Sequence, residues 1–223
     1  MRSSSLPAMV LGVLCLLAPA AAIARTADFQ GAAVSADARQ VADWTIGSDD
    51  HAGLPFVIVD KVKARVFVFD GHGILLGAAP ALVGLARGDD SAPGVGDRPL
   101  AAIAPSERTT PAGRFVASLG QDLSKEVLWV DYADAISLHP VITTNPKEHR
   151  LRRLASAEPL DHRISYGCIN VPAAFYAEVV SPAFTATHGV VYILPETRSI
   201  AATFAMAPPP DHPRAILEAR AGR

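Results

Sequence analysis

One cysteine has neighbours that suit a nucleophile. Cys168 lies in the segment Ser165-Tyr166-Gly167-Cys168-Ile169-Asn170, and the second cysteine, Cys15, is close to the N-terminus. Glycine and small residues let backbone N–H groups approach a reacting carbonyl, where negative charge develops in a tetrahedral intermediate. A thiol also needs a base or a cation that favours the thiolate. The segment therefore predicts acyl transfer on Cys168, and the alternative is an inert buried thiol.

His139 is the best-placed base for this thiol among the seven histidines. It follows the apolar run Ala135-Ile136-Ser137-Leu138, which reads as a strand. A strand end on a rigid sheet holds a side chain in the fixed geometry that a base requires. The alternative is a histidine that only satisfies a hydrogen bond there. The other six occur in turns, loops or the tail: His51, His72, His149, His162, His188 and His212.

The chain resembles the L,D-transpeptidase (YkuD-like) family over roughly residues 55–194. Four features occur in the family's order: Arg65-Val66-Phe67-Val68-Phe69, Thr110-Pro111-Ala112-Gly113-Arg114-Phe115, Ile136-Ser137-Leu138-His139, and the segment around Cys168. Three features depart from the family. Tyr166 stands where a histidine is usual, Pro140 follows the base where glycine is common, and the gap between base and cysteine is longer.

The resemblance implies a mainly β fold, an L,D-transpeptidase-like β-sandwich with a few short helices and a lid loop. It implies acyl transfer without a cofactor or a metal. Cys168 would attack a tetrapeptide stem of peptidoglycan and expel the terminal D-alanine. An amine of a second stem would then capture the thioester. Capture by water would make the enzyme an L,D-carboxypeptidase, and capture by a lysine would attach a protein to the wall.

The resemblance also assigns roles around the thiol. His139 would take the thiol proton and return it to the leaving amine. Backbone N–H groups of Gly167 and Cys168, with Tyr166 as a further candidate, would form the oxyanion hole. Ser165 and Asn170 would shape the loop or touch substrate. Carbapenems are expected inhibitors, because their strained amide resembles the scissile bond.

A basic run between the base and the cysteine offers a site for substrate carboxylates. Its members are His149, Arg150, Arg152, Arg153, His162 and Arg163. Arg163 lies closest to the cysteine segment, so we expect it to bind substrate. The alternative is a solvated, charged loop without a ligand.

The elements that must position these residues follow from residue patterns. Strands are expected at 56–60, 65–70, 74–76, 82–84, 113–118, 127–132, 135–139 and 190–194, with Gly71-His72-Gly73 forming a hairpin turn. Ser35 is a candidate cap for a short helix from Ala36 towards Trp44, and 172–180 is a second helix. The polar stretch 140–163 is expected to be a loop.

The N-terminus has the pattern of an export signal. Arg2 precedes an apolar stretch from Leu6 to Leu17, and Ala22-Ile23-Ala24 offers a cleavage site. The alternative is an uncleaved anchor, for which the stretch is short. We therefore expect an exported protein of the periplasm or cell wall, with no stable membrane span after cleavage. The expected organisation is a signal at 1–24, a lead-in with a short helix at 25–54, a catalytic domain at 55–196, and a Pro-rich tail at 197–223.

Composition and cysteine usage exclude several classes of protein. The formal charge of −2 gives no concentrated basic face for nucleic acid. No Cys/His spacing predicts a metal site. A thiol-redox protein would need a partner cysteine, which signal cleavage would remove. A catalytically silent wall-binding protein of the same fold would need neither Cys168 nor His139.

Overall fold

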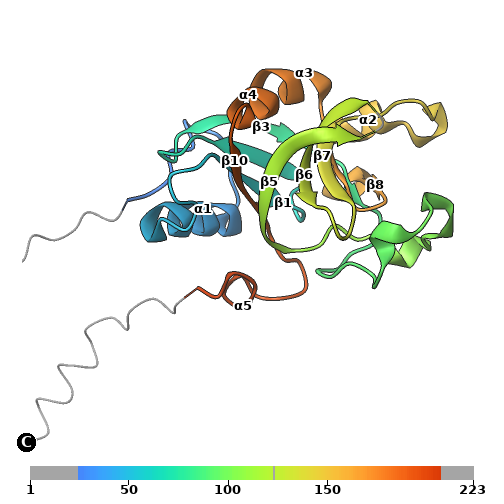
Figure 1. Ribbon diagram of the computed structural model, residues 1–223, viewed down its shortest axis with the longest axis horizontal. Coiled ribbons are helices and arrows are strands. Elements are labelled where there is room, and N and C mark those ends of the chain that lie inside the picture. Colours follow the sequence, from blue (N-terminus) through green and yellow to red (C-terminus); the bar gives the residue numbers. More distant parts are fainter. Residues whose placement is uncertain (1–24, 123, 207–223) are drawn as a thin grey trace, which may run out of the picture.

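An eight-stranded sheet dominates the computed structural model, which describes residues 25–122 and 124–206 (Figure 1). The strand order is β3-β2-β1-β10-β5-β6-β7-β9, and β4 and β8 form a separate two-stranded sheet. The strands are β1 (Phe56–Asp60), β2 (Arg65–Phe69), β3 (Leu75–Pro80), β4 (Val83–Gly84), β5 (Gly113–Asp122), β6 (Lys125–Asp131), β7 (Ile136–Pro140), β8 (Arg163–Ser165), β9 (Ile169–Val171) and β10 (His188–Ile193).

The helical elements are short apart from the first. The α-helices are α1 (Ala36–Ser48), α2 (Arg150–Leu154), α3 (Ala173–Phe175), α4 (Ser181–Phe184) and α5 (Ile200–Phe204). A π-helical turn, η6 (Tyr176–Val180), joins α3 to α4. The 3₁₀ turns are η1 (Val95–Asp97), η2 (Leu100–Ala102), η3 (Pro105–Glu107), η4 (Pro146–Glu148) and η5 (Pro159–His162).

Two hydrophobic clusters lie on opposite faces of the sheet, because successive strand residues point to opposite sides. On β1, Val57 and Val59 belong to one cluster, and Phe56 and Ile58 to the other. The first cluster contains residues of the strands that follow one another in the sheet from β2 to β9, together with η6 and α4. The sheet therefore curves around it. The second cluster is closed by α1. Burial of each large apolar side chain contributes about 1.5–3 kcal/mol.

Capping fixes where α1 begins. The Ser35 hydroxyl accepts a hydrogen bond from the Ala38 N–H and donates one to the Asp60 carboxylate. The buried residues Ala38, Val41, Ala42, Thr45 and Ile46 form the inward face of the helix. The prediction that Ser35 caps a helix from Ala36 is therefore confirmed, and the helix continues one turn past Trp44 to Ser48.

The prediction of a mainly β fold with a few short helices is confirmed. The prediction of a loop across 140–163 is wrong in part, because η4, α2 and η5 lie there. Within the region assigned to a tail, α5 packs Phe204 into the second cluster. The predicted export signal and the Pro-rich end lie outside the described residues. Over the part of the chain that is described, no helix is long and apolar enough to cross a membrane.

Candidate functional site

The loop that carries Cys168 links β8 to β9 and is held by its own hydrogen bonds. The Ser165 hydroxyl donates to the Cys168 carbonyl at 2.7 Å and accepts from the Gly167 N–H at 3.1 Å. Gly167 has a φ of +138°, which L side chains rarely adopt, and a Cβ there would lie 2.7 Å from the Ile136 Cδ1 atom. Glycine at 167 is therefore required for the backbone path that presents the cysteine.

The Gly167 N–H, expected to serve an oxyanion hole or to support the loop, has a partner within the loop. It donates to the Ser165 hydroxyl and so stabilises the loop, and its role toward an oxyanion stays a prediction. Tyr166 packs against a cation, because the Arg108 guanidinium lies 4.0 Å above the centre of its ring. This contact gives Tyr166 a packing role at the rim of the loop.

The Cys168 thiol is half-buried and lies beside Ser137 on the neighbouring strand. The Ser137 hydroxyl donates to Sγ at 3.7 Å, and Sγ donates to the Ala135 carbonyl at 3.5 Å. Burial raises the pKa of the Cys168 thiol above its usual 9.0, although hydrogen bonds from the backbone and side chain of Ser137 oppose this. The resting cysteine is therefore a protonated thiol that needs a base. Ser137 was not among the predicted site residues. It lies two residues before His139 on the same expected strand, and this spacing indicates that the two side chains share a face.

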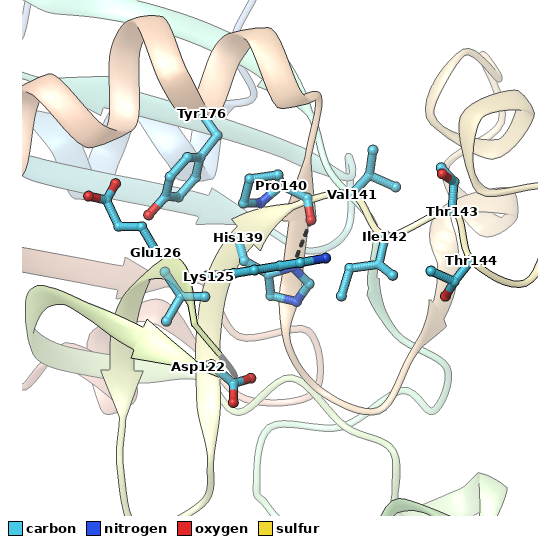
Figure 2. A pocket seen from close by; sticks show the side chains of 11 residues that line it. Asp122, Lys125, Glu126, His139, Pro140, Val141, Ile142, Thr143, Thr144 and Tyr176 are labelled. Carbon is cyan, nitrogen blue, oxygen red and sulfur yellow. Dashed lines mark hydrogen bonds between the residues drawn. The ribbon is translucent and has the colours of Figure 1, made fainter.

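His139 on β7 is held in one tautomer by the carbonyl of the next residue. Its Nδ1–H donates to the Pro140 oxygen at 2.8 Å (Figure 2). This bond leaves Nε2 as the basic atom, and Nε2 lies 3.4 Å from Nδ2 of Asn170, which is long for a hydrogen bond. Burial lowers the pKa of His139 below its usual 6.5, while the Pro140 carbonyl opposes that change. The imidazole is thus neutral and able to accept a proton.

Strand register brings the two predicted catalytic residues onto one face. In the parallel β7–β9 pair, His139 is opposite Asn170, so Cys168, two residues earlier, falls beside Ser137. Residues two apart on a strand share a face, and therefore Cys168 and His139 project to the same side of the sheet. Within the described residues, however, the hydrogen-bond partners of the sulfur are Ser137 and Ala135, not His139.

Asn170 is buried and connects the base to the basic segment. Its Oδ1 accepts from Arg150 Nη1 at 2.6 Å, and its Nδ2 donates to the Cys168 carbonyl at 3.3 Å. Arg150 at the start of α2 also pairs with Glu148. The basic run thus contributes Arg150 to the site. Its positive charge lowers the pKa of both His139 and Cys168, after the larger effects of burial and hydrogen bonding.

Arg163, for which substrate binding was predicted, is engaged in contacts within the fold, and that role stays an untested prediction. Its guanidinium donates to the carbonyls of Gly84 and Ala86 and pairs with Glu196, a carboxylate that is almost fully buried. The Arg163 side chain is only 10% exposed. Its donors are committed within the fold, so it stabilises β4–β8.

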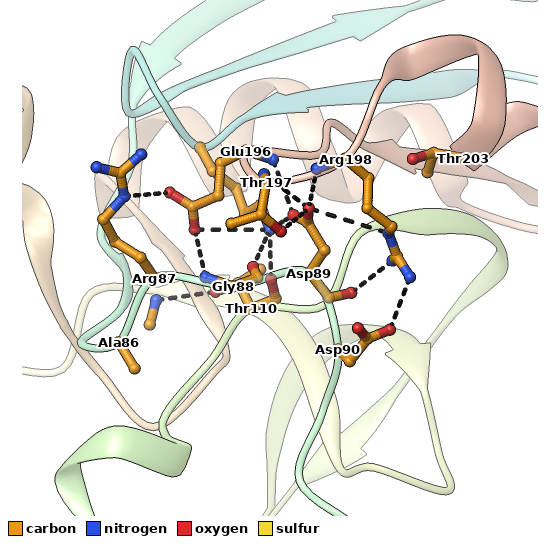
Figure 3. A network of polar contacts seen from close by, with 12 residues as sticks. Ala86, Arg87, Gly88, Asp89, Asp90, Thr110, Glu196, Thr197, Arg198 and Thr203 are labelled. Carbon is orange, nitrogen blue, oxygen red and sulfur yellow. Dashed lines mark hydrogen bonds and ion pairs between the residues drawn. The ribbon is translucent and has the colours of Figure 1, made fainter.

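Glu196 belongs to a network of ion pairs and hydrogen bonds that also contains Asp89 (Figure 3). Asp89 accepts hydrogen bonds from Lys61 and from the backbone N–H groups that follow β10. Although burial acts in the opposite direction, the bonds from Thr197 and Lys61 hold the pKa of Asp89 well below its usual 3.8. Burial lowers the pKa of Lys61, and its bond to Asp89 opposes this.

Thr110 links this network to the cysteine loop. Its carbonyl accepts from Lys61 Nζ at 2.9 Å, and its hydroxyl donates to the Gly167 carbonyl at 2.7 Å. The Thr-Pro segment noted in the sequence therefore fixes the residue that precedes Cys168.

We expect Asp89→Asn to destabilise the fold by about 3–5 kcal/mol, because it leaves a buried Lys61 ammonium without its closest counter-charge. Urea unfolding followed by circular dichroism measures the change. Asp90→Asn is the matched control, since Asp90 is 79% exposed and its ion pair with Arg198 contributes less than about 1 kcal/mol. Equal stabilities of the two variants would contradict the importance assigned to the network.

A cavity of about 550 Å³ lies against His139. Its walls come from the β5–β6 hairpin, from the segment after β7 and from η6, and Figure 2 shows Glu126, Tyr176 and His139 bordering it. Cys168 is not part of its lining. The cavity therefore borders the imidazole of His139 and not the thiol.

The pKa directions predict a broad pH profile for attack by Cys168. A lowered pKa keeps His139 neutral down to a pH below 6.5, and a raised pKa keeps the thiol protonated to a pH above 9.0. We expect the rate of thiol acylation to be nearly constant between these values, to fall at lower pH as His139 becomes protonated, and not to fall at higher pH as the thiolate forms. Thiolate absorbance near neutral pH would contradict this, because it would indicate an ion pair at rest.

Comparisons with known proteins match parts of solved structures. No family model matches the chain, and no curated protein matches it. An L,D-transpeptidase, LdtMt1, solved in complex with imipenem is 14% identical, with 63% of this chain and 58% of that chain covered and a TM-score of 0.36. The catalytic domain of the E. faecium L,D-transpeptidase is 14% identical over 62% of this chain and 95% of that chain, with a TM-score of 0.35.

A cell-shape protein is also similar. The helical cell shape determining protein Pgp2 of Campylobacter jejuni, as a K307A mutant, is 9% identical, with 65% of this chain and 48% of that chain covered and a TM-score of 0.43. The chain thus spans about half of the first two solved proteins that it matches. Identities and TM-scores are low, so what these proteins bind or catalyse is not transferred to this chain.

Proposed function

We propose that this protein is an exported L,D-transpeptidase that acts on peptidoglycan stem peptides, with Cys168 as nucleophile and His139 as base. One observation carries the proposal. A half-buried thiol and an imidazole with a fixed tautomer share one face of the paired strands β7 and β9. A silent binding protein needs neither group, and a buried, hydrogen-bonded imidazole beside a free thiol suits acyl transfer.

The reaction is a pair of acyl transfers. The Cys168 proton passes to Nε2 of His139 as Sγ attacks the stem carbonyl, the C–N bond breaks, and His139 returns the proton to the departing amine of D-alanine. The thioester that remains is attacked by an amine. The C–S bond then breaks, and the proton from the amine passes through His139 to the sulfur.

Two features of the site support this sequence of steps. The 3.4 Å contact between Asn170 and Nε2 is weak, so Nε2 is available to the thiol. The Ser137 hydroxyl already points at Sγ and stabilises negative charge on it. The choice of peptidoglycan stems as substrate rests on the resemblance of the segment around Cys168 and of the Thr-Pro segment to the family.

Intact-protein mass spectrometry after incubation with imipenem tests the nucleophile. We expect a single adduct on the wild-type protein and none on Cys168→Ala, because the thiol opens the strained amide to form a thioester. An adduct that persists in Cys168→Ala would overturn the assignment of the nucleophile. Absence of an adduct on the wild type under the same conditions would count against the acyl-enzyme chemistry.

A further inference from the structure

The side-chain amide of Asn170 has one orientation, set by the groups around it. Asn170 is 1% exposed, and its Oδ1 accepts a hydrogen bond from Arg150 Nη1 at 2.6 Å. Its Nδ2 donates to the Cys168 carbonyl at 3.3 Å and lies 3.4 Å from Nε2 of His139. A reversed amide would bring its N–H groups against the guanidinium and its oxygen against the Cys168 carbonyl. The bond from Arg150 therefore keeps the N–H side of the amide toward the base.

This orientation suits an imidazole that carries no proton on Nε2. Because Nδ1–H of His139 donates to the Pro140 carbonyl, the lone pair of the neutral ring is on Nε2 and faces an N–H group of Asn170. Once Nε2 takes the thiol proton, two N–H groups face each other and the amide offers no acceptor. Asn170 thus disfavours the imidazolium, which makes the proton easier to return to a leaving amine.

Arg150 comes from the segment between the base and the cysteine, where the sequence departs from the family. It is the first residue of α2, its side chain is 12% exposed, and it also pairs with Glu148. Other contacts hold α2 in place. Arg153 donates to the carbonyls of Glu148 and Asp161, and Leu154 is buried. The helix therefore does not depend on Arg150 for its position.

Charged and titratable groups approach His139 from several elements. They are Asp122, Lys125, Glu126 and Tyr176 in the walls of the cavity, Arg150 with its partner Glu148, and Cys168 on the loop before β9. Burial has the largest effect on the pKa of His139 and lowers it. Among the charges, that of Arg150 acts most strongly and also lowers this pKa, followed by Asp122, which raises it, and Lys125, which lowers it.

We propose that Arg150 is a positioning residue for the transfer reaction, which acts through Asn170 to keep the imidazole of His139 unprotonated at rest and ready to release the proton that it takes. This inference rests on the proposed function. Within residues 25–122 and 124–206, the polar partners of Arg150 are Glu148 and Asn170, so it touches neither the thiol nor the imidazole. The segment between β7 and β8 thus sets the state of the base.

Two variants separate the charge of Arg150 from its hydrogen bonds. Arg150→Met removes both, whereas Arg150→Lys keeps the charge and lacks the planar fork that bonds Glu148 and Asn170 together. The rate of Cys168 acylation by imipenem is measured across the pH range in which histidine titrates. We expect Arg150→Met to lower the plateau rate about 10–10²-fold, because a freed amide can turn its oxygen to Nε2.

The acidic limb of the profile distinguishes positioning from a merely structural role. Loss of the positive charge raises the pKa of His139, so the limb of Arg150→Met should move to higher pH. Arg150→Lys should lose a similar part of the rate with a smaller shift of the limb. Arg152→Met is the matched control, since Arg152 is exposed on the same helix and should change neither quantity.

An unmoved limb in Arg150→Met, with or without a loss of rate, would overturn the inference, and a wild-type plateau in Arg150→Lys would overturn the action through Asn170. NMR titration of the ¹⁵N-labelled His139 ring follows the same change without turnover, and circular dichroism checks the fold. Failure of the proposed function has a different signature. In that case imipenem would leave wild-type Cys168 unmodified, while the His139 titration would still differ between Arg150→Met and the wild type.

Discussion

Cys168→Ala is expected to abolish turnover of a tetrapeptide stem, with a loss of at least about 10⁴-fold, because no other group can form the thioester. Quantitative mass spectrometry of released D-alanine and of cross-linked products measures the loss. The protein should remain folded, since the thiol is only half-buried and its bonds to Ser137 and Ala135 are weak sulfur contacts.

The fold of that variant is checked by circular dichroism and urea unfolding. We expect its free energy of unfolding to lie within about 1 kcal/mol of the wild type. Retained turnover in a folded Cys168→Ala protein would contradict the mechanism. Loss of turnover accompanied by unfolding would instead assign Cys168 a structural role.

His139→Ala is expected to lower kcat/KM by about 10²–10⁴-fold, because the thiol then has no base. The raised pKa of Cys168 makes this dependence strong, since little thiolate forms without help at neutral pH. The residual activity should increase with pH up to values above 9.0 as the thiol ionises by itself. Rates measured from pH 6 to pH 10 show whether the profile has changed from a plateau to a rising curve.

His72→Ala is the matched control for that variant, because His72 is exposed in the hairpin turn and has no contact with the site. It should behave as the wild type does. A His139→Ala protein with an unchanged plateau would show that another group takes the thiol proton.

Local patterns were sufficient for most strands and for α1. Strands such as Phe56–Asp60 have runs of apolar and β-branched residues, and Ser35 precedes α1 with the side chain that a cap requires. Cys168 and His139 could be proposed as a pair because glycine next to cysteine and histidine at a strand end are local features.

The supporting residues could not be predicted, because their roles depend on contacts between distant segments. Arg163 was expected to bind substrate because it is close in sequence to the cysteine segment. Its ion-pair partner, Glu196, lies 33 residues further along the chain. Arg150 reaches the site only because α2 forms within a stretch that reads as a loop. Tyr176 looks like an ordinary residue in an apolar helix, and only its place in a π-helical turn beside a cavity distinguishes it.

The most direct test of the central claim is mass spectrometry of the products formed when residues 25–223 are mixed with purified disaccharide-tetrapeptide. We predict dimers formed with loss of one D-alanine, dependent on Cys168. Trimmed monomers alone would establish hydrolysis and an L,D-carboxypeptidase. Recovery of unchanged tetrapeptide, with Cys168 still a free thiol, would contradict the proposed function.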